Sequence, residues 1–211
     1  MQNGRLSTLA DGIFAIVMTL LVFEMRLPNL PPGVSSEMLL TYLRPLLPAL
    51  GSYVLTFTLL FTYWKAHHFF VSVYAKNIDS RLTNINVLFL MLIALVPFSS
   101  TLLSRYSENQ AAISIFGLHI ILVGLTLYWM RRYVLFSSHI KNPEITEHEI
   151  RGSTVRTLVP VLFALIAIGL AFWHPKVSVY IFTLAVLFNL THWSTVFFER
   201  VFFRKKIPTS N

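Results

Sequence analysis

Residues 5–23 read RLSTLADGIFAIVMTLLVF, an apolar run of membrane-spanning length that contains one acidic residue, Asp11. A helix of about 20 apolar residues crosses the hydrocarbon core of a bilayer. An ionised carboxylate at that depth is costly unless a partner or water reaches it. Asp11 is therefore a candidate functional residue, and the rest of the chain indicates what kind of site it belongs to.

The composition indicates an integral membrane protein. The chain of 211 residues is 55% hydrophobic but only 12% charged, about half the charged share of an ordinary soluble domain. Lipid offers no partners to backbone amides, and the apolar runs are continuous rather than alternating, so helices are favoured over a β-barrel. We predict one all-α domain over residues 1–211, a six-helix transmembrane bundle with spans near 6–25, 46–63, 82–103, 111–133, 157–173 and 177–198.

The distribution of basic residues predicts the orientation of this bundle. If the N-terminus is cytoplasmic, 13 of the 17 Lys and Arg residues lie in cytoplasmic segments, and the exceptions are Arg26, Arg44, Arg105 and Lys176. The positive-inside rule then puts both termini in the cytoplasm. A basic rim against anionic lipid accounts for the net charge of +8 without a nucleic-acid partner.

Polar residues near the cytoplasmic end of the second predicted span are candidates for a buried network with Asp11. Residues 63–70 read YWKAHHFF. Trp64 and His68 are four residues apart and share a helix face, whereas His67 points about 100° away from His68. An aromatic belt at the membrane interface is the alternative interpretation of this segment. No metal site is predicted, because the His-x-x-x-His spacing is absent.

The third predicted span contributes two further features. Asn84 and Asn86 lie at its cytoplasmic end, at the depth expected for Asp11 and His68. Polar groups from three helices at one level are what a buried hydrogen-bond network requires. Near the other end of the span, Pro97 predicts a kink or the last turns of the helix.

The first apolar run also carries a stripe along one helix face. Gly12, Ile16, Thr19 and Phe23 recur at spacings of four, three and four residues, with Leu20 beside them. A surface that packs or faces lipid would show the same pattern. The functional interpretation is a pore lining, because an apolar constriction can gate a pore by dewetting. Spacing alone leaves both interpretations open.

Three motifs resemble the transmembrane protein 175 family of potassium channels. Its signature is an arginine, three residues, then Phe-Ser-Asp, and residues 5–12 read RLSTLADG. Leu9 and Ala10 stand where the family has Phe and Ser. The stretches W-x-x-H-H-x-F at 64–70 and N…L-x-P-F at 86–98 are similar to the family's second and third helices.

The resemblance implies a potassium-permeable cation channel of modest selectivity over sodium, without a cofactor. A single repeat of this length implies the bacterial homotetramer, in the plasma membrane, with the first helix lining the pore. On this sequence, Ile16, Leu20 and Phe23 would form the constriction and Thr19 a polar ring, with K+ in transit near Ile16 and Thr19. The residues expected to hold the first helix in place are Arg5, Asp11, Trp64, His68 and, at the same depth, Asn84.

A proton-coupled transporter or a membrane enzyme is the alternative, with Asp11 and His68 as a proton relay. Against an enzyme, the interior of the spans lacks a second acid, a suitable serine-histidine pair and a metal motif. Against a transporter, no inverted repeat is visible. We therefore predict a channel and no enzymatic activity. Conductance in liposomes without a coupled ion or substrate would distinguish the two.

Overall fold

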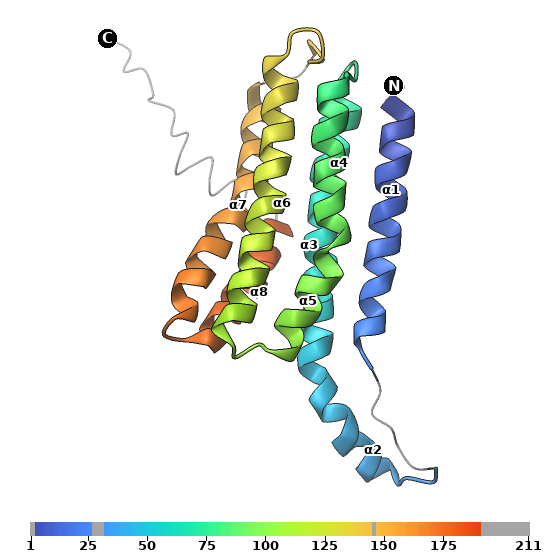
Figure 1. The fold of residues 1–211 in the computed structure, drawn as a ribbon, viewed down its shortest axis with the longest axis vertical. Helices are drawn as coiled ribbons and strands as arrows, with labels where there is room; N and C mark the ends of the chain where they lie inside the picture. The colour runs from blue at the N-terminus through green and yellow to red at the C-terminus, as the bar shows by residue number, and fades with distance from the viewer. Residues whose placement is uncertain (1–2, 27–31, 145–146, 191–211) are drawn as a thin grey trace, which may run out of the picture.

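The computed structural model describes residues 3–26, 32–144 and 147–190, and its elements are all helices (Figure 1). This confirms the all-α prediction. In chain order the elements are α1 (Asn3–Leu20), η1 (Leu21–Glu24), α2 (Ser36–Leu43), η2 (Arg44–Leu46), α3 (Leu47–His68), η3 (Phe69–Tyr74), α4 (Ser80–Ala94), α5 (Val96–Arg105), α6 (Gln110–Phe136), α7 (Glu147–Ala171) and α8 (Pro175–Leu190).

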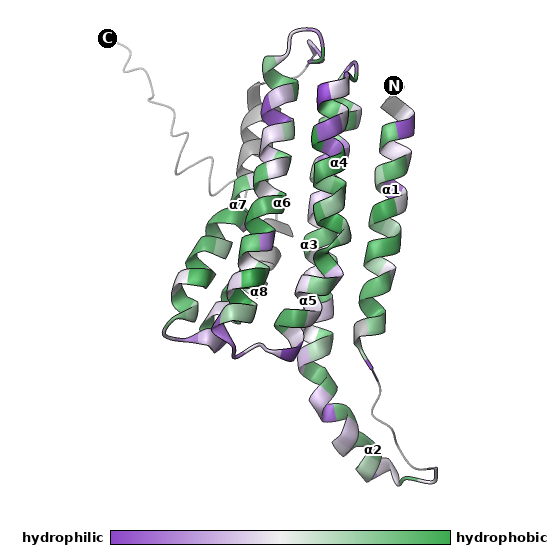
Figure 2. Cartoon of the chain, viewed as in Figure 1, coloured by the Kyte–Doolittle hydropathy of each residue, from purple (hydrophilic) through white to green (hydrophobic). Residues whose placement is uncertain are grey.

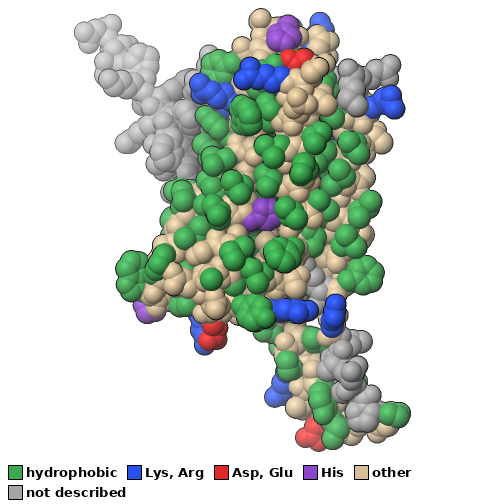
Figure 3. All heavy atoms as spheres, in the orientation of Figure 1, with side chains coloured by type: hydrophobic (Ala, Val, Ile, Leu, Met, Phe, Trp, Pro, Cys, Tyr) green, Lys and Arg blue, Asp and Glu red, His purple; other side chains and the backbone are tan. Residues whose placement is uncertain are grey.

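Within the described ranges, four helical stretches are long and apolar enough to cross a membrane: Gly4–Phe23, Ser36–Tyr74, Ser80–Arg105 and Gln110–Phe136. A shorter apolar helix covers Thr157–Ala171. Apolar side chains cover the middle of the bundle, and charged side chains gather towards its two ends (Figures 2 and 3). The second predicted span, 46–63, lies within a longer helical stretch, because its helix continues through η3 to Tyr74. Of the last predicted span, residues 191–198 lie outside the described residues.

Side-chain caps fix where several helices begin. Ser35, Asp79 and Asn109 each precede a helix, and each side chain accepts a hydrogen bond from a backbone N–H of the first turn. Such caps satisfy donors that have no partner within the helix. The caps of Asp79 and Asn109 lie at opposite ends of the bundle, so they help to define where the chain enters and leaves the apolar layer (Figure 1).

The third predicted span is two helices, because Leu95 separates α4 from α5. Pro97 has no N–H to donate to the carbonyl one turn earlier, so the hydrogen-bond ladder is interrupted there. His119 of α6 covers the break: its Nε2 donates to the Leu92 carbonyl at 2.9 Å, and its Nδ1 lies 2.7 Å from the Ser99 hydroxyl oxygen. The expected interruption at Pro97 is thus present, with a polar contact from another helix.

Helix α6 is the centre of the packing and contacts α4, α5, α7 and α8. It approaches α7 closely at two glycines. A Cβ atom at Gly124 would lie 2.3 Å from Val161 Cγ2, and one at Gly117 would lie 2.6 Å from Ile168 Cγ1. Small residues allow such backbone approach between membrane helices. Helix α1 lies at the edge of the bundle opposite α7, where it packs against α3 and α4 (Figure 1).

Candidate pore helix and its polar supports

Helix α1, together with η1 that continues it, has one buried face and one open face. The buried face comprises Leu6, Ala10, Phe14, Val17 and Leu21, none more than 4% exposed. These residues follow helical spacing and pack on α3, α4 and η3. The open face carries the stripe singled out in the sequence: Gly12, Ile16, Thr19, Leu20 and Phe23 are all exposed on the protomer. Ile16 is 60% exposed and Phe23 72%.

Thr19 places a hydroxyl oxygen on this open face. Its Oγ1 lies 2.8 Å from the Ile16 carbonyl oxygen and 3.0 Å from that of Ala15, so its single proton is donated to the backbone. A hydroxyl that has donated its proton in this way presents only lone pairs to its other neighbours. The side chain is therefore arranged to accept from a donor or to contact a cation.

Asp11 is held by the second membrane helix. Trp64 Nε1 donates to Asp11 Oδ1 at 2.7 Å. The Trp64 ring in turn stacks on His68, with centroids 6.0 Å apart and an interplanar angle of 28°. Asp11 precedes Gly12 by one residue, so it points about 100° away from Gly12 around the helix. It therefore supports the helix from the side of α3 rather than lying in the stripe.

His68 and Arg5 do not contact Asp11 in the described protomer. His68 Nδ1 lies 3.5 Å from Ser72 Oγ, which lies 3.5 Å from Ser7 Oγ of α1. His68 thus reaches α1 through serine hydroxyls. Arg5 is exposed, and its six-residue separation from Asp11 puts the two about 120° apart around the helix. The two side chains therefore face different directions within one copy of the chain.

A second polar pair lies in the core beside α1. His67 and Asn86 are 2% and 0% exposed, and His67 Nε2 lies 2.6 Å from Asn86 Oδ1, to which it donates. The His67 ring stacks on Phe89 with centroids 5.4 Å apart and an interplanar angle of 4°, and Phe14 of α1 lies 6.4 Å away. The pair therefore joins α3 to α4 directly behind the buried face of α1.

Within a single chain, the buried polar positions are occupied by close sequence neighbours of two residues expected in the network. Asn84 is exposed, and Asn86, two residues later, takes the buried position. Likewise His67 is the inward histidine, while His68 remains exposed. Which residue is buried depends on the direction of its side chain relative to the neighbouring helices, because adjacent residues of a helix point about 100° apart.

Replacing Trp64 with phenylalanine tests the support of Asp11. The ring and its stacking remain, but the N–H donor to the carboxylate is lost. We expect a loss of about 1 kcal/mol in the free energy of unfolding, less than for a buried charge-assisted bond because Asp11 is exposed on the protomer. Thermal unfolding of the purified protein in detergent measures this loss of stability. Trp129→Phe on α6 is the matched control, and equal stability of the two variants would contradict this role.

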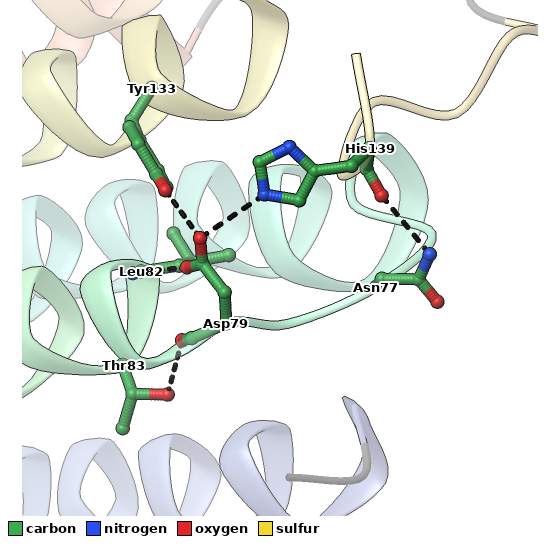
Figure 4. A network of polar contacts seen from close by, with 6 residues as sticks. All are labelled: Asn77, Asp79, Leu82, Thr83, Tyr133 and His139. Carbon is green, nitrogen blue, oxygen red and sulfur yellow. Dashed lines mark hydrogen bonds and ion pairs between the residues drawn. The ribbon is translucent and has the colours of Figure 1, made fainter. Parts of the chain in front are cut away.

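The end of the bundle that carries the N-terminus has its own polar network (Figure 4). Asp79 Oδ2 accepts from the Tyr133 hydroxyl, and it lies 3.3 Å from Nε2 of His139. Burial by itself raises the pKa of Asp79, but hydrogen bonds from Tyr133, the Leu82 N–H and His139 outweigh it and lower the pKa below its usual value. Asn77 Nδ2 donates to the His139 carbonyl oxygen at 3.1 Å.

Backbone bonds reinforce this network. Lys76 N donates to the Ile140 carbonyl at 2.7 Å, and Asn142 N donates to the Tyr74 carbonyl at 2.8 Å. These bonds flank an antiparallel bridge between Ala75 and Lys141. The turn before α4 is thereby joined to the loop after α6. The network is a structural junction at the end of the helices rather than part of the open face of α1.

Comparison with known proteins finds a match to the part of the chain that contains the candidate pore helix. Residues 5–97, which contain most of α1 and all of α3 and α4, match the model of the family described as endosomal/lysosomal potassium channel TMEM175. A potassium channel from Streptomyces collinus is 27% identical over 177 residues, which are 81% of this chain and 83% of that protein. The rat protein named endosomal/lysosomal proton channel TMEM175 is 22% identical over 190 residues, 90% of this chain but 37% of that protein.

A solved structure supports the match in three dimensions. The crystal structure of a lysosomal potassium-selective channel TMEM175 homolog from Chamaesiphon minutus superposes with a TM-score of 0.75 at 25% sequence identity, covering 89% of this chain and 95% of that chain. The motif resemblance, the matched family segment and the shared fold agree. The chain is thus similar to the TMEM175 channel family over residues 5–97, and its fold is similar to that of a bacterial homolog of this family.

Proposed function

We propose that four copies of this chain form a potassium-permeable cation channel whose central pore is lined by α1. The observation that carries this proposal is the open face of α1 and η1, where Ile16, Thr19, Leu20 and Phe23 are exposed while the opposite face is packed. This face lies wholly within the segment that matches the channel family. In the proposed orientation both termini are cytoplasmic, and the membrane is the plasma membrane of a bacterium.

Ile16 is the proposed constriction. It lies about one turn beyond Gly12, which has no side chain to narrow a pore at its own level. Four isoleucine side chains that face one axis leave an opening too apolar to hold water readily, and this is a barrier to any ion. Leu20 and Phe23 would continue the apolar lining towards the far end of the helix.

Thr19 is the proposed selectivity ring. Because its proton is donated to the backbone, four such hydroxyls would offer oxygen lone pairs to a passing cation. Potassium is dehydrated more easily than sodium, so a sparse ring of oxygens favours it moderately. K+ would pass Ile16 and Thr19 in succession, without the dense carbonyl ligation of a dedicated filter.

The polar residues are proposed to fix the rotation of α1. The Trp64–Asp11 hydrogen bond sets one side of the helix against α3, and the buried His67–Asn86 pair supports the face behind it. Arg5 is exposed and directed away from Asp11, so its proposed role is between copies of the chain. Any rotation of α1 would move Ile16 off the axis, so these bonds act on conduction by positioning.

Thr19→Val tests the selectivity ring, because valine keeps the shape and removes the oxygen. We expect the potassium-to-sodium permeability ratio to fall by about threefold, less than the tenfold that 1.4 kcal/mol represents. Reversal potentials under bi-ionic conditions in a planar bilayer measure the ratio. Thr101→Val on α5 is the control, since its hydroxyl also bonds its own helix. A ratio unchanged by Thr19→Val would remove Thr19 from the permeation path.

A second candidate activity is proton permeation, which is favoured by the name of the rat relative, a proton channel. It does not require the Asp11–His68 relay, and in the described protomer these side chains bond Trp64 and Ser72 respectively. Currents recorded across a pH gradient with symmetrical potassium separate the two ions. A reversal potential that follows the proton gradient would assign the current to protons.

A further inference from the structure

A cavity lies between α3, α5 and α8 at the end of the bundle opposite the N-terminus. Its volume is about 460 Å³, and Leu55 and Leu103 form part of its apolar wall. Its polar lining includes the hydroxyls of Ser104 and Ser107 and the charged side chains of Glu108 and Lys176. No hydrogen bond joins the Ser104 or Ser107 side chain to another described residue. The cavity therefore combines an apolar wall with unused hydroxyls and both signs of charge.

The charges form a pair at the edge of the cavity. Lys176 Nζ lies 3.0 Å from Glu108 Oε1, and both side chains remain largely exposed. An ammonium group has three donors and a carboxylate accepts several bonds, so each group keeps capacity for a ligand. The ammonium group of Lys176 can therefore bind an anionic group of a ligand, and the adjacent carboxylate of Glu108 can bind a cationic group. That is the complement of a zwitterion.

Aromatic residues place this edge at the level of lipid headgroups. Tyr106 and Trp173 are 56% and 74% exposed, and they precede Glu108 and Lys176 by two and three residues. Exposed tyrosine and tryptophan at the ends of membrane helices mark the bilayer interface. Leu55 and Leu103 of the apolar wall belong to two helical stretches that are long enough to span the membrane. A lipid entering here would bring its headgroup to the charges and its chains to the apolar wall.

We propose that this cavity binds a zwitterionic aminophospholipid, with Lys176 contacting the phosphate and Glu108 the primary ammonium. A primary ammonium donates hydrogen bonds to a carboxylate, whereas the quaternary ammonium of a choline headgroup has no proton to donate. A glycerol headgroup lacks the cation altogether. The site goes beyond the proposed channel function and does not depend on it, because binding is measured without current.

Native mass spectrometry of the full-length purified protein, with added phosphatidylethanolamine, phosphatidylcholine or phosphatidylglycerol, tests the proposal. We expect the ethanolamine lipid to be retained roughly threefold more than the choline lipid, as suits one exposed ionic contact. Glu108→Gln should remove this preference, and Lys176→Gln should reduce retention of all three lipids. Glu37→Gln, a carboxylate on α2 outside the cavity, should leave the preference intact.

A variant that fills the cavity gives a second test. A Cβ added to Gly51, which lines the cavity, meets nothing within 4 Å, so Gly51→Leu occupies the space without a backbone clash. It should lower ethanolamine-lipid retention to the level of the choline lipid. Gly169→Leu on α7 also has open space at Cβ and serves as the control. Equal retention of both lipids by the unmodified protein, or retention unaffected by Gly51→Leu, would overturn the proposal. Displacement of the lipid by equimolar soluble phosphoethanolamine would overturn the assignment to a lipid.

Discussion

Ile16→Asn is expected to raise single-channel conductance on the order of tenfold, which corresponds to lowering the barrier to permeation by about 1.4 kcal/mol. Four asparagine side chains in place of four isoleucines would hold water at the narrowest point and remove the dewetting barrier. The same change should weaken the discrimination between potassium and sodium. Single-channel recording in a planar bilayer measures both effects.

The control for this variant is Ile115→Asn. Ile115 lies near the start of α6 and is 48% exposed, so it receives the same substitution on a different open surface. Assembly should be unchanged in Ile16→Asn, because the side chain faces the proposed axis rather than the packed side of α1. If conductance and selectivity both matched the unmodified protein, the stripe would be a packing or lipid-facing surface.

His67→Ala is expected to cause the largest loss of stability, about 3 kcal/mol in the free energy of unfolding. The substitution removes a buried ring from between Phe14 and Phe89 and leaves the Asn86 amide oxygen without its donor. The buried face of α1 would lose part of its support. Chemical unfolding in detergent, followed by the yield of assembled protein, measures the effect.

The adjacent histidine is the matched control for His67. His68 is exposed and bonds only Ser72 at 3.5 Å among the described residues, so His68→Ala should cost well under half as much. Replacing both His67 and Asn86 with apolar residues of similar volume should recover part of the loss, because no buried polar atom then lacks a partner. A greater loss from His68→Ala than from His67→Ala would contradict the account.

The class of the protein and the open stripe of α1 could be predicted from the sequence, because both depend on local patterns. Apolar runs reveal membrane helices, and the helical period alone aligns Ile16, Thr19 and Phe23. Trp64 and Asp11 were expected in one network, and they share a hydrogen bond. Their proposed roles in the pore rest on the assembly of four chains.

The choice between neighbouring residues could not be predicted in this way. Whether His67 or His68 points inward depends on which side of α3 the other helices cover, and the pattern of α3 itself does not specify that side. Likewise, whether Asn84 or Asn86 is buried depends on which side of α4 the other helices cover. The contact of His119 with the break beside Pro97, and the cavity beside Lys176, bring together segments far apart in the chain.

The most direct test of the central claim uses single cysteines, because the chain contains none of its own. Cysteine is placed in turn at Ile16, Thr19, Leu20 and Phe23, and at Leu122 and Leu125 on the exposed surface of α6 as controls. A charged, water-soluble thiol reagent is then applied to both sides of a bilayer during recording. The account predicts that the reagent alters current through the α1 variants and leaves the α6 variants unchanged. Unaltered current in all four α1 variants, with conduction intact, would contradict an α1-lined pore.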